Sequence, residues 1–158
     1  MRTCVLILDN LRSVENTASI FRTAEGLGVN KIICVGTTPT PLDRFGRKRT
    51  DFAKVALGAE DLIDWEYVAI ENLQLTISNL KNDGFKILAL EQSSKATELR
   101  TYEASNLERF ALVVGNEVDG VSSEALEASD TILEIPMHGK KESLNVSVST
   151  GIALFVLL

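Results

Sequence analysis

The chain has 158 residues, of which 45% are hydrophobic, and its formal net charge is -6. A chain of this length can bury the core of one domain, and the hydrophobic fraction argues against intrinsic disorder. The negative charge excludes a global basic field that would attract nucleic acid, so a role on RNA or DNA requires a local basic patch or a partner.

The two cysteines, Cys4 and Cys34, lie inside apolar, strand-like runs. This setting indicates buried free thiols in a reducing compartment, not a disulfide or a metal pair. No stretch resembles a signal peptide, and no apolar run approaches the ~18 residues that a membrane span needs. We therefore expect a cytoplasmic protein without a membrane segment and without a metal.

Strand-like and helix-like runs alternate along the whole chain. Short apolar runs predict strands at Thr3 to Leu8, Lys31 to Val35, Leu62 to Val68, Lys86 to Leu90, Phe110 to Val114 and Thr131 to Ile135. N-caps, glycine stops and helical spacing predict helices at Val14 to Leu27, Thr50 to Leu57, Glu71 to Asn82, after Ser122 through Ala128, and from Ser143 to the last residue.

This alternation predicts one α/β domain over residues 1–158, with a mainly parallel sheet flanked by helices and no separate RNA-recognition domain. Ligands of such sheets bind beyond the carboxyl ends of the strands. The candidate loops are those after Leu8, Val35, Leu90, Val114 and Ile135.

The first candidate segment runs from Asn10 to Ala24. On a helix, Arg22 shares a stripe with Ser19, and the small residues around it leave the guanidinium room to reach a partner. Asn16 lies in the first turn, nearer the strand ends. The alternative interpretation is an exposed helix with an Arg22–Glu25 ion pair at i, i+3.

The second segment is Phe110 to Gly120, where a buried strand leads into two glycines that bracket two carboxylates. Gly115 would allow a ligand to approach the backbone closely. Glu117 would accept hydrogen bonds from a polar ligand or fix a neighbouring arginine. The alternative is a tight turn into the helix at Ser122; no Lys-Ser/Thr follows, so this is not a phosphate-binding P-loop.

The third segment is Ile135 to Val148, a strand end, a polar loop and a helix that we expect to begin at Ser143. The free N–H groups of a first helical turn suit a polar or anionic ligand. A well-capped helix is the alternative, but it leaves the run of Ser143, Asn145 and Ser147 unexplained, because these are mediocre helix formers. We interpret His138 as a solvent-facing loop residue, not a proton carrier.

A separate basic cluster contains Arg44, Arg47, Lys48 and Arg49 around Phe45. As a loop, it would contact phosphates and stack on a base of RNA. The alternative is a solvated loop without a partner.

Together and in this order, the three segments resemble the motifs of the SpoU (TrmH-like) branch of the SPOUT superfamily of RNA 2'-O-ribose methyltransferases. The matching residues are Asn16…Arg22-Thr23-Ala24, Val114-Gly115-Asn116-Glu117…Gly120 and Ile135-Pro136-Met137…Ser143-Leu144-Asn145-Val146-Ser147. One departure is Ala18, which stands where the family usually has glycine.

The resemblance implies an S-adenosylmethionine-dependent enzyme that methylates a ribose 2'-hydroxyl of tRNA or rRNA. It also implies a deep trefoil knot in the C-terminal half, although threaded chains are rare, and a homodimer that completes each active site. A non-catalytic RNA-binding protein that kept the fold, or a nucleotide-binding α/β enzyme of another class, is the alternative. Cofactor binding and labelled methyl transfer to RNA discriminate among the three.

The resemblance also assigns expected roles to individual residues. The cofactor would lie against Leu90, Gly115, Ile135, Met137, Ser143 and Leu144. Catalysis would involve Arg22 at the 2'-hydroxyl, held together with the ribose and phosphate by Asn16, Glu117, Ser143 and Asn145. RNA would be bound by Arg12, Arg44, Arg47, Lys48 and Arg49.

Two further expectations concern chemistry and assembly. An arginine side chain stays protonated in proteins, so we expect Arg22 to stabilise the forming oxyanion while the proton leaves through water or the phosphate. The last helix carries Leu144, Val148, Ile152 and Phe155 on one stripe, which predicts a twofold homodimer.

Overall fold

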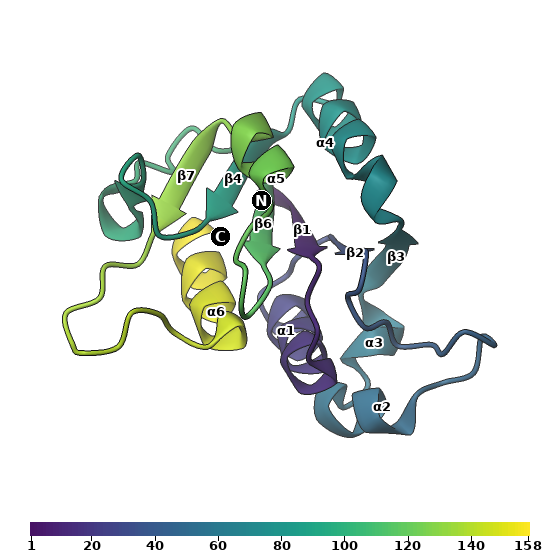
Figure 1. Cartoon of the computed structure of the whole chain (residues 1–158). Helices are drawn as coiled ribbons and strands as arrows, with labels where there is room; N and C mark the ends of the chain where they lie inside the picture. Colours follow the sequence, from purple (N-terminus) through teal and green to yellow (C-terminus); the bar gives the residue numbers. More distant parts are fainter.

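Seven parallel strands form one sheet in the computed structural model of the protein, which describes residues 1–158 (Figure 1). Their order across the sheet is β3-β2-β1-β6-β4-β7-β5. The strands are β1 Thr3–Asp9, β2 Lys31–Val35, β3 Asp64–Val68, β4 Lys86–Leu90, β5 Thr97–Glu98, β6 Arg109–Gly115 and β7 Thr131–Glu134. The predicted α/β class is confirmed, and every strand pair is parallel.

Helices cover both faces of the sheet. They are α1 Val14–Gly26, α2 Thr50–Ala56, α3 Ala59–Leu62, α4 Leu73–Asn82, α5 Ser123–Ala128 and α6 Val146–Leu157, with short 3-10 turns η1 Ile70–Asn72 and η2 Leu99–Thr101. Helices α1, α2 and α6 contribute to one hydrophobic cluster, and α4 and α5 to the other. Figure 1 shows α1 and α6 side by side, with α4 and α5 on the other side of the strands.

The two hydrophobic clusters explain why the strands are continuous apolar runs. In β1, Cys4, Leu6 and Leu8 belong to one cluster, while Val5 and Ile7 belong to the other. Successive side chains of a strand point to opposite faces, so a strand covered by helices on both sides needs apolar residues at every position.

The last helix begins three residues later than predicted, at Val146 instead of Ser143. Asn145 is its N-cap, because the side-chain Oδ1 accepts hydrogen bonds from the N–H groups of Ser147 at 2.9 Å and Val148 at 3.4 Å. Ser143 is an equally suitable cap by residue type, so the sequence alone does not discriminate between the two positions.

The third strand also differs from its prediction. Leu62 ends the short helix α3, and β3 begins at Asp64. As an edge strand, β3 is half-exposed and lacks the continuous apolar run of the central strands. The two-residue strand β5 was not predicted at all; it pairs with β7 at the opposite edge.

Both cysteines are free and buried, as the sequence predicts, and burial raises the pKa of each thiol to about 12. No helix combines the length and the apolar character that a membrane span requires. The trefoil knot that the resemblance implies stays a prediction.

Candidate active site

A cavity of about 470 Å³ lies at the carboxyl ends of β4, β6 and β7. It is lined by the ends of these strands, by the loops that follow them, by Asn16 of α1 and by Val146 and Ser149 of α6. All six residues predicted for the cofactor line it: Leu90, Gly115, Ile135, Met137, Ser143 and Leu144. Of the predicted catalytic residues, it contains Asn16, Glu117, Ser143 and Asn145.

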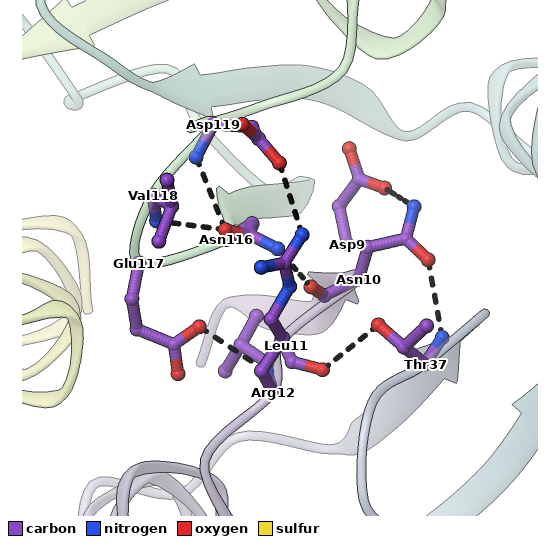
Figure 2. Close-up of polar contacts among 9 residues, drawn as sticks. All are labelled: Asp9, Asn10, Leu11, Arg12, Thr37, Asn116, Glu117, Val118 and Asp119. Atoms are coloured by element: carbon purple, nitrogen blue, oxygen red, sulfur yellow. Dashed lines mark hydrogen bonds and ion pairs between the residues drawn. The ribbon is translucent and has the colours of Figure 1, made fainter.

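Glu117 ties the second segment to the start of α1. Its Oε2 accepts the backbone N–H of Arg12 at 3.1 Å (Figure 2), and its Oε1 accepts the N–H of Ser13 and the side-chain Nδ2 of Asn16, both at 3.2 Å. Partial burial pushes the pKa of Glu117 upward, but hydrogen bonds from its own N–H, from Asn16, and from Ser13 and Arg12 outweigh it. The net pKa is below the usual glutamate value, so the group is a carboxylate at neutral pH.

Asn16 and Asn145 continue this network across the cavity. The Nδ2 group of Asn145 donates to Oδ1 of Asn16 at 3.0 Å, and the Oδ1 of Asn145 accepts the hydroxyl of Ser147 at 2.6 Å. A chain of three side chains, from Glu117 through Asn16 to Asn145, therefore joins all three sequence segments. The two contacts of Asn16 join residues 101 and 129 positions apart, so the sequence indicates the residue types but not their contact.

The loop after β6 is folded against itself at its glycines. A Cβ on Gly115 would lie 2.1 Å from the carbonyl carbon of Gly120 and 2.2 Å from the backbone nitrogen of Val121. Asn116 closes the same turn, because its Oδ1 accepts the N–H groups of Val118 and Asp119 at 2.7 and 3.0 Å (Figure 2). Glycine is therefore required at position 115, because the loop's own backbone occupies the space that a Cβ would take. Gly115 also lines the cavity, and the close approach of a ligand to its backbone stays a prediction.

Two carboxylates that the sequence analysis missed hold this loop in place. The Oδ2 of buried Asp9 accepts the N–H of Ser122 at 2.8 Å, and the Oε2 of Glu91 accepts the N–H of Val121 at 2.9 Å. Glu91 also lines the cavity. Both residues directly follow apolar strand positions, so an acidic residue at the carboxyl end of a buried strand is the signal that would have found them.

Arg22 lies outside the cavity. It is exposed on α1, between buried Phe21 and half-buried Thr23, and it forms no ion pair, so the alternative Arg22–Glu25 pair is wrong. Asn16 is six positions earlier on the helix, about 240° around its axis, which is why the two side chains point in different directions.

Most of the predicted RNA-binding cations have carboxylate neighbours. The ion pairs are Arg12–Asp119 at 3.3 Å, Arg47–Asp43 at 2.9 Å, Lys48–Asp61 at 2.8 Å and Arg49–Asp51 at 2.8 Å. Only Arg44 of the predicted set has no acidic partner. The positive electrostatic potential around these residues is therefore weaker than the number of basic residues in the sequence indicates.

Residues 3–155 match the model of the SpoU rRNA Methylase family. The chain belongs to this family. The match extends over nearly the whole chain, so it includes the sheet, the cavity and all three segments that the Glu117–Asn16–Asn145 network joins. The family that the sequence resemblance implied is therefore confirmed.

Several known proteins are similar to this chain in sequence or in fold. The 23S rRNA (guanosine-2'-O-)-methyltransferase RlmB of Neisseria meningitidis is 33% identical over 150 residues, covering 95% of this chain and 56% of the relative. The AdoMet-bound rRNA methyltransferase of Sinorhizobium meliloti superposes with a TM-score of 0.86 at 26% identity, over 98% of this chain and 55% of that one. The TrmH/SpoU tRNA modifying enzyme of A. aeolicus superposes with a TM-score of 0.84 at 29% identity, over 99% of this chain and 74% of that one. The chain thus spans about half the length of the curated relatives it matches.

Proposed function

We propose that this SpoU-family chain transfers a methyl group from S-adenosylmethionine to a ribose 2'-hydroxyl of RNA. The observation that carries the proposal is the cavity at the strand ends, where apolar and polar lining residues meet in one place. A volume of about 470 Å³ is within the range of small-molecule sites. The names of the relatives support ribose methylation as the reaction and tRNA or rRNA as the substrate class.

The residues of the cavity fit the proposed cofactor. Leu90, Ile135 and Met137 offer apolar contacts for the adenosine part, while the backbone groups of the loops after β4, β6 and β7 offer donors and acceptors. When bound, S-adenosylmethionine supplies a methyl group on a positively charged sulfur. Transfer then depends mainly on how the chain aligns the accepting oxygen with that methyl group.

The Glu117–Asn16–Asn145 network has the groups to perform this alignment. The Glu117 carboxylate fixes the start of α1 and the Asn16 side chain, which in turn fixes Asn145. We propose that these amides, with Ser143, hold the ribose and its phosphate at the cavity. Side chains that are already held in place lose little freedom when the substrate arrives.

Arg22 would stabilise the 2'-oxyanion as it forms, and we propose that a second copy of the chain provides it. In one copy, Arg22 is exposed and outside the cavity. Helix α6 presents an apolar face to solvent beside α1: Val148 is 51% exposed, Ile152 40% and Phe155 76%. A twofold dimer through this face would bury it and bring α1 of one copy toward the cavity of the other.

Mixing two inactive variants tests the shared site. Arg22→Ala removes the arginine, and Asn145→Asp changes the cavity, so each homodimer should lack transfer. In a re-equilibrated equal mixture, half of the dimers are mixed and each contains one intact site, so about a quarter of wild-type activity should return. If the mixture stays inactive although mixed dimers form, Arg22 does not act on the second copy's cavity.

Tritium transfer tests the reaction itself. The chain is incubated with methyl-labelled S-adenosylmethionine and total RNA, with Arg22→Ala as the matched control. We expect label in RNA for the wild type and a loss of at least about 100-fold for Arg22→Ala, the usual effect of removing one oxyanion donor. RNA binding without any label would indicate a non-catalytic protein that kept the fold.

The reducing compartment that the buried thiols favour supports the cytoplasm as the place of action.

A further inference from the structure

The loop between β2 and α2 forms a small, closed hairpin. Leu42 and Lys48 pair as an antiparallel bridge, and the N–H of Asp43 donates to the carbonyl of Arg47 at 2.8 Å. The side chain of Asp43 closes the turn, because its Oδ1 accepts the N–H of Phe45 at 2.8 Å and of Arg47 at 3.0 Å. The tip is therefore fixed before any ligand arrives.

The tip presents an aromatic ring that no other element covers. Phe45 is 66% exposed, and the guanidinium carbons of Arg44 and Arg47 lie 4.8 and 5.0 Å from its ring centroid. Guanidinium planes and aromatic rings are the surfaces on which unpaired bases stack. The chemistry of this tip matches a base better than it matches a phosphate.

The charges of the hairpin support the same choice. Two of its three cations, Arg47 and Lys48, are paired with aspartates at 2.9 and 2.8 Å, and the adjoining Arg49 is paired in the same way at 2.8 Å. With a net charge of -6 for the whole chain, little unbalanced positive charge is available for phosphates. Stacking does not need that charge, because every base has a flat face.

The hairpin follows β2, and the cavity lies after β6, β4 and β7. In a parallel sheet, all these loops are at the same edge. Only β1 separates β2 from β6, a spacing of roughly 10 Å. Figure 1 shows the β2–α2 loop and the β7–α6 loop reaching outward at opposite ends of this edge. One RNA strand at this edge would meet both the cavity and the hairpin.

We propose that the hairpin Leu42–Lys48 binds an unpaired base near the methylated nucleotide by stacking it on the Arg44, Phe45 and Arg47 tip. This assignment rests on the proposed function, because it takes RNA as the substrate. Of the two roles that the sequence indicated for the cluster, phosphate contact and base stacking, it keeps the second and makes Phe45 the central residue.

Fluorescence anisotropy with two probes tests the assignment: a labelled single-stranded oligouridine and an RNA duplex of equal length. Phe45→Ala should weaken binding of the single strand by about 5- to 100-fold, the loss typical of one stacked base, and leave duplex binding unchanged. Phe45→Trp should retain the affinity. Leu75→Ala, which removes a 60% exposed side chain on α4, is the matched control and should have no effect.

Salt dependence separates stacking from phosphate contact. Stacking releases no counterions, so the slope of log affinity against log salt should be the same for Phe45→Ala and the wild type. Equal single-strand affinities for the two proteins would overturn the inference, as would a changed oligomeric state of Phe45→Ala, which would make the tip a protein contact. Phe45-dependent binding without methyl transfer would contradict the proposed function and leave this assignment intact.

Discussion

Asn145 uses both ends of its side-chain amide. Its oxygen caps α6 through the N–H of Ser147, and its nitrogen donates to Asn16 in the cavity network. The cap is a matter of local stability, whereas the contact with Asn16 belongs to the proposed site. Two substitutions at this position separate these roles.

We predict that Asn145→Asp keeps the stability of the wild type and loses activity. Aspartate is as good a cap as asparagine, but it cannot donate to Asn16. Asn145→Ala should lose both the activity and about 1 kcal/mol of unfolding free energy. Urea unfolding and kcat/KM for RNA measure the two effects. An Asn145→Asp variant with full activity would show that the donated bond has no role.

Glu117 should make stability depend on pH in a defined direction. Hydrogen bonds lower its pKa in the folded chain, so its stabilising contribution is complete above the ordinary glutamate pKa of ~4.3 and is lost as the pH falls through the lower folded-state value. Glu117→Gln should therefore be less stable than the wild type at pH 7, because its amide nitrogen would face an N–H donor.

Urea midpoints at neutral and acidic pH measure this difference. The gap between Glu117→Gln and the wild type should narrow as the pH falls below ~4.3. Glu103→Gln, an exposed residue without a hydrogen bond, is the control and should stay within about 0.5 kcal/mol of the wild type. A gap that does not change with pH would contradict the proposed role of the carboxylate.

At the scale of the elements, the loop after β6 depends on a glycine. We predict that Gly115→Ala destabilises the chain by about 1–3 kcal/mol and abolishes cofactor binding, because the new Cβ would overlap the backbone of Gly120. Gly139→Ala is the matched control, since its Cβ would meet nothing within 4 Å. Titration calorimetry measures the affinity for S-adenosylmethionine, and thermal unfolding measures the stability of each variant. A Gly115→Ala chain that binds normally would contradict this packing.

The central strands could be predicted because each is an apolar run buried on both faces. The start of α6 could not, because Ser143 and Asn145 are equally good caps and the choice depends on the contact of Asn145 with Asn16, far away in the sequence. The same limit applies to the cavity. The residue types at the strand ends could be predicted, but the contacts among them could not. The sequence places Asp9 and Glu91 at strand ends, but their partners could not be predicted, because these carboxylates contact backbone N–H groups that any residue has.

At the scale of the whole molecule, the buried thiols report on unfolding. Burial raises the pKa of Cys4 and Cys34 to about 12, so almost no thiolate is present near neutral pH. We predict that a thiol reagent such as dithiobis-nitrobenzoate modifies neither residue in the native chain and modifies both in urea. Rapid modification of the native chain would contradict the burial of β1 and β2.

The exposed face of α6 should control assembly. We predict that Phe155→Asp yields a monomer that binds S-adenosylmethionine but transfers no methyl group, because a charge would be buried in the proposed interface. Leu75→Asp places the same charge on α4 and should leave the oligomeric state unchanged. Light scattering measures the oligomeric state, and transfer assays measure the methylation of RNA. A Phe155→Asp dimer would place the interface elsewhere.

Alkaline hydrolysis of labelled RNA tests the central claim most directly. Alkali cleaves RNA through the 2'-hydroxyl, so a 2'-O-methyl group protects the adjacent linkage. After incubation with methyl-labelled S-adenosylmethionine and RNA, we predict that the label remains in alkali-stable dinucleotides. Label in mononucleotides would show methylation of a base and would contradict ribose methylation by this chain.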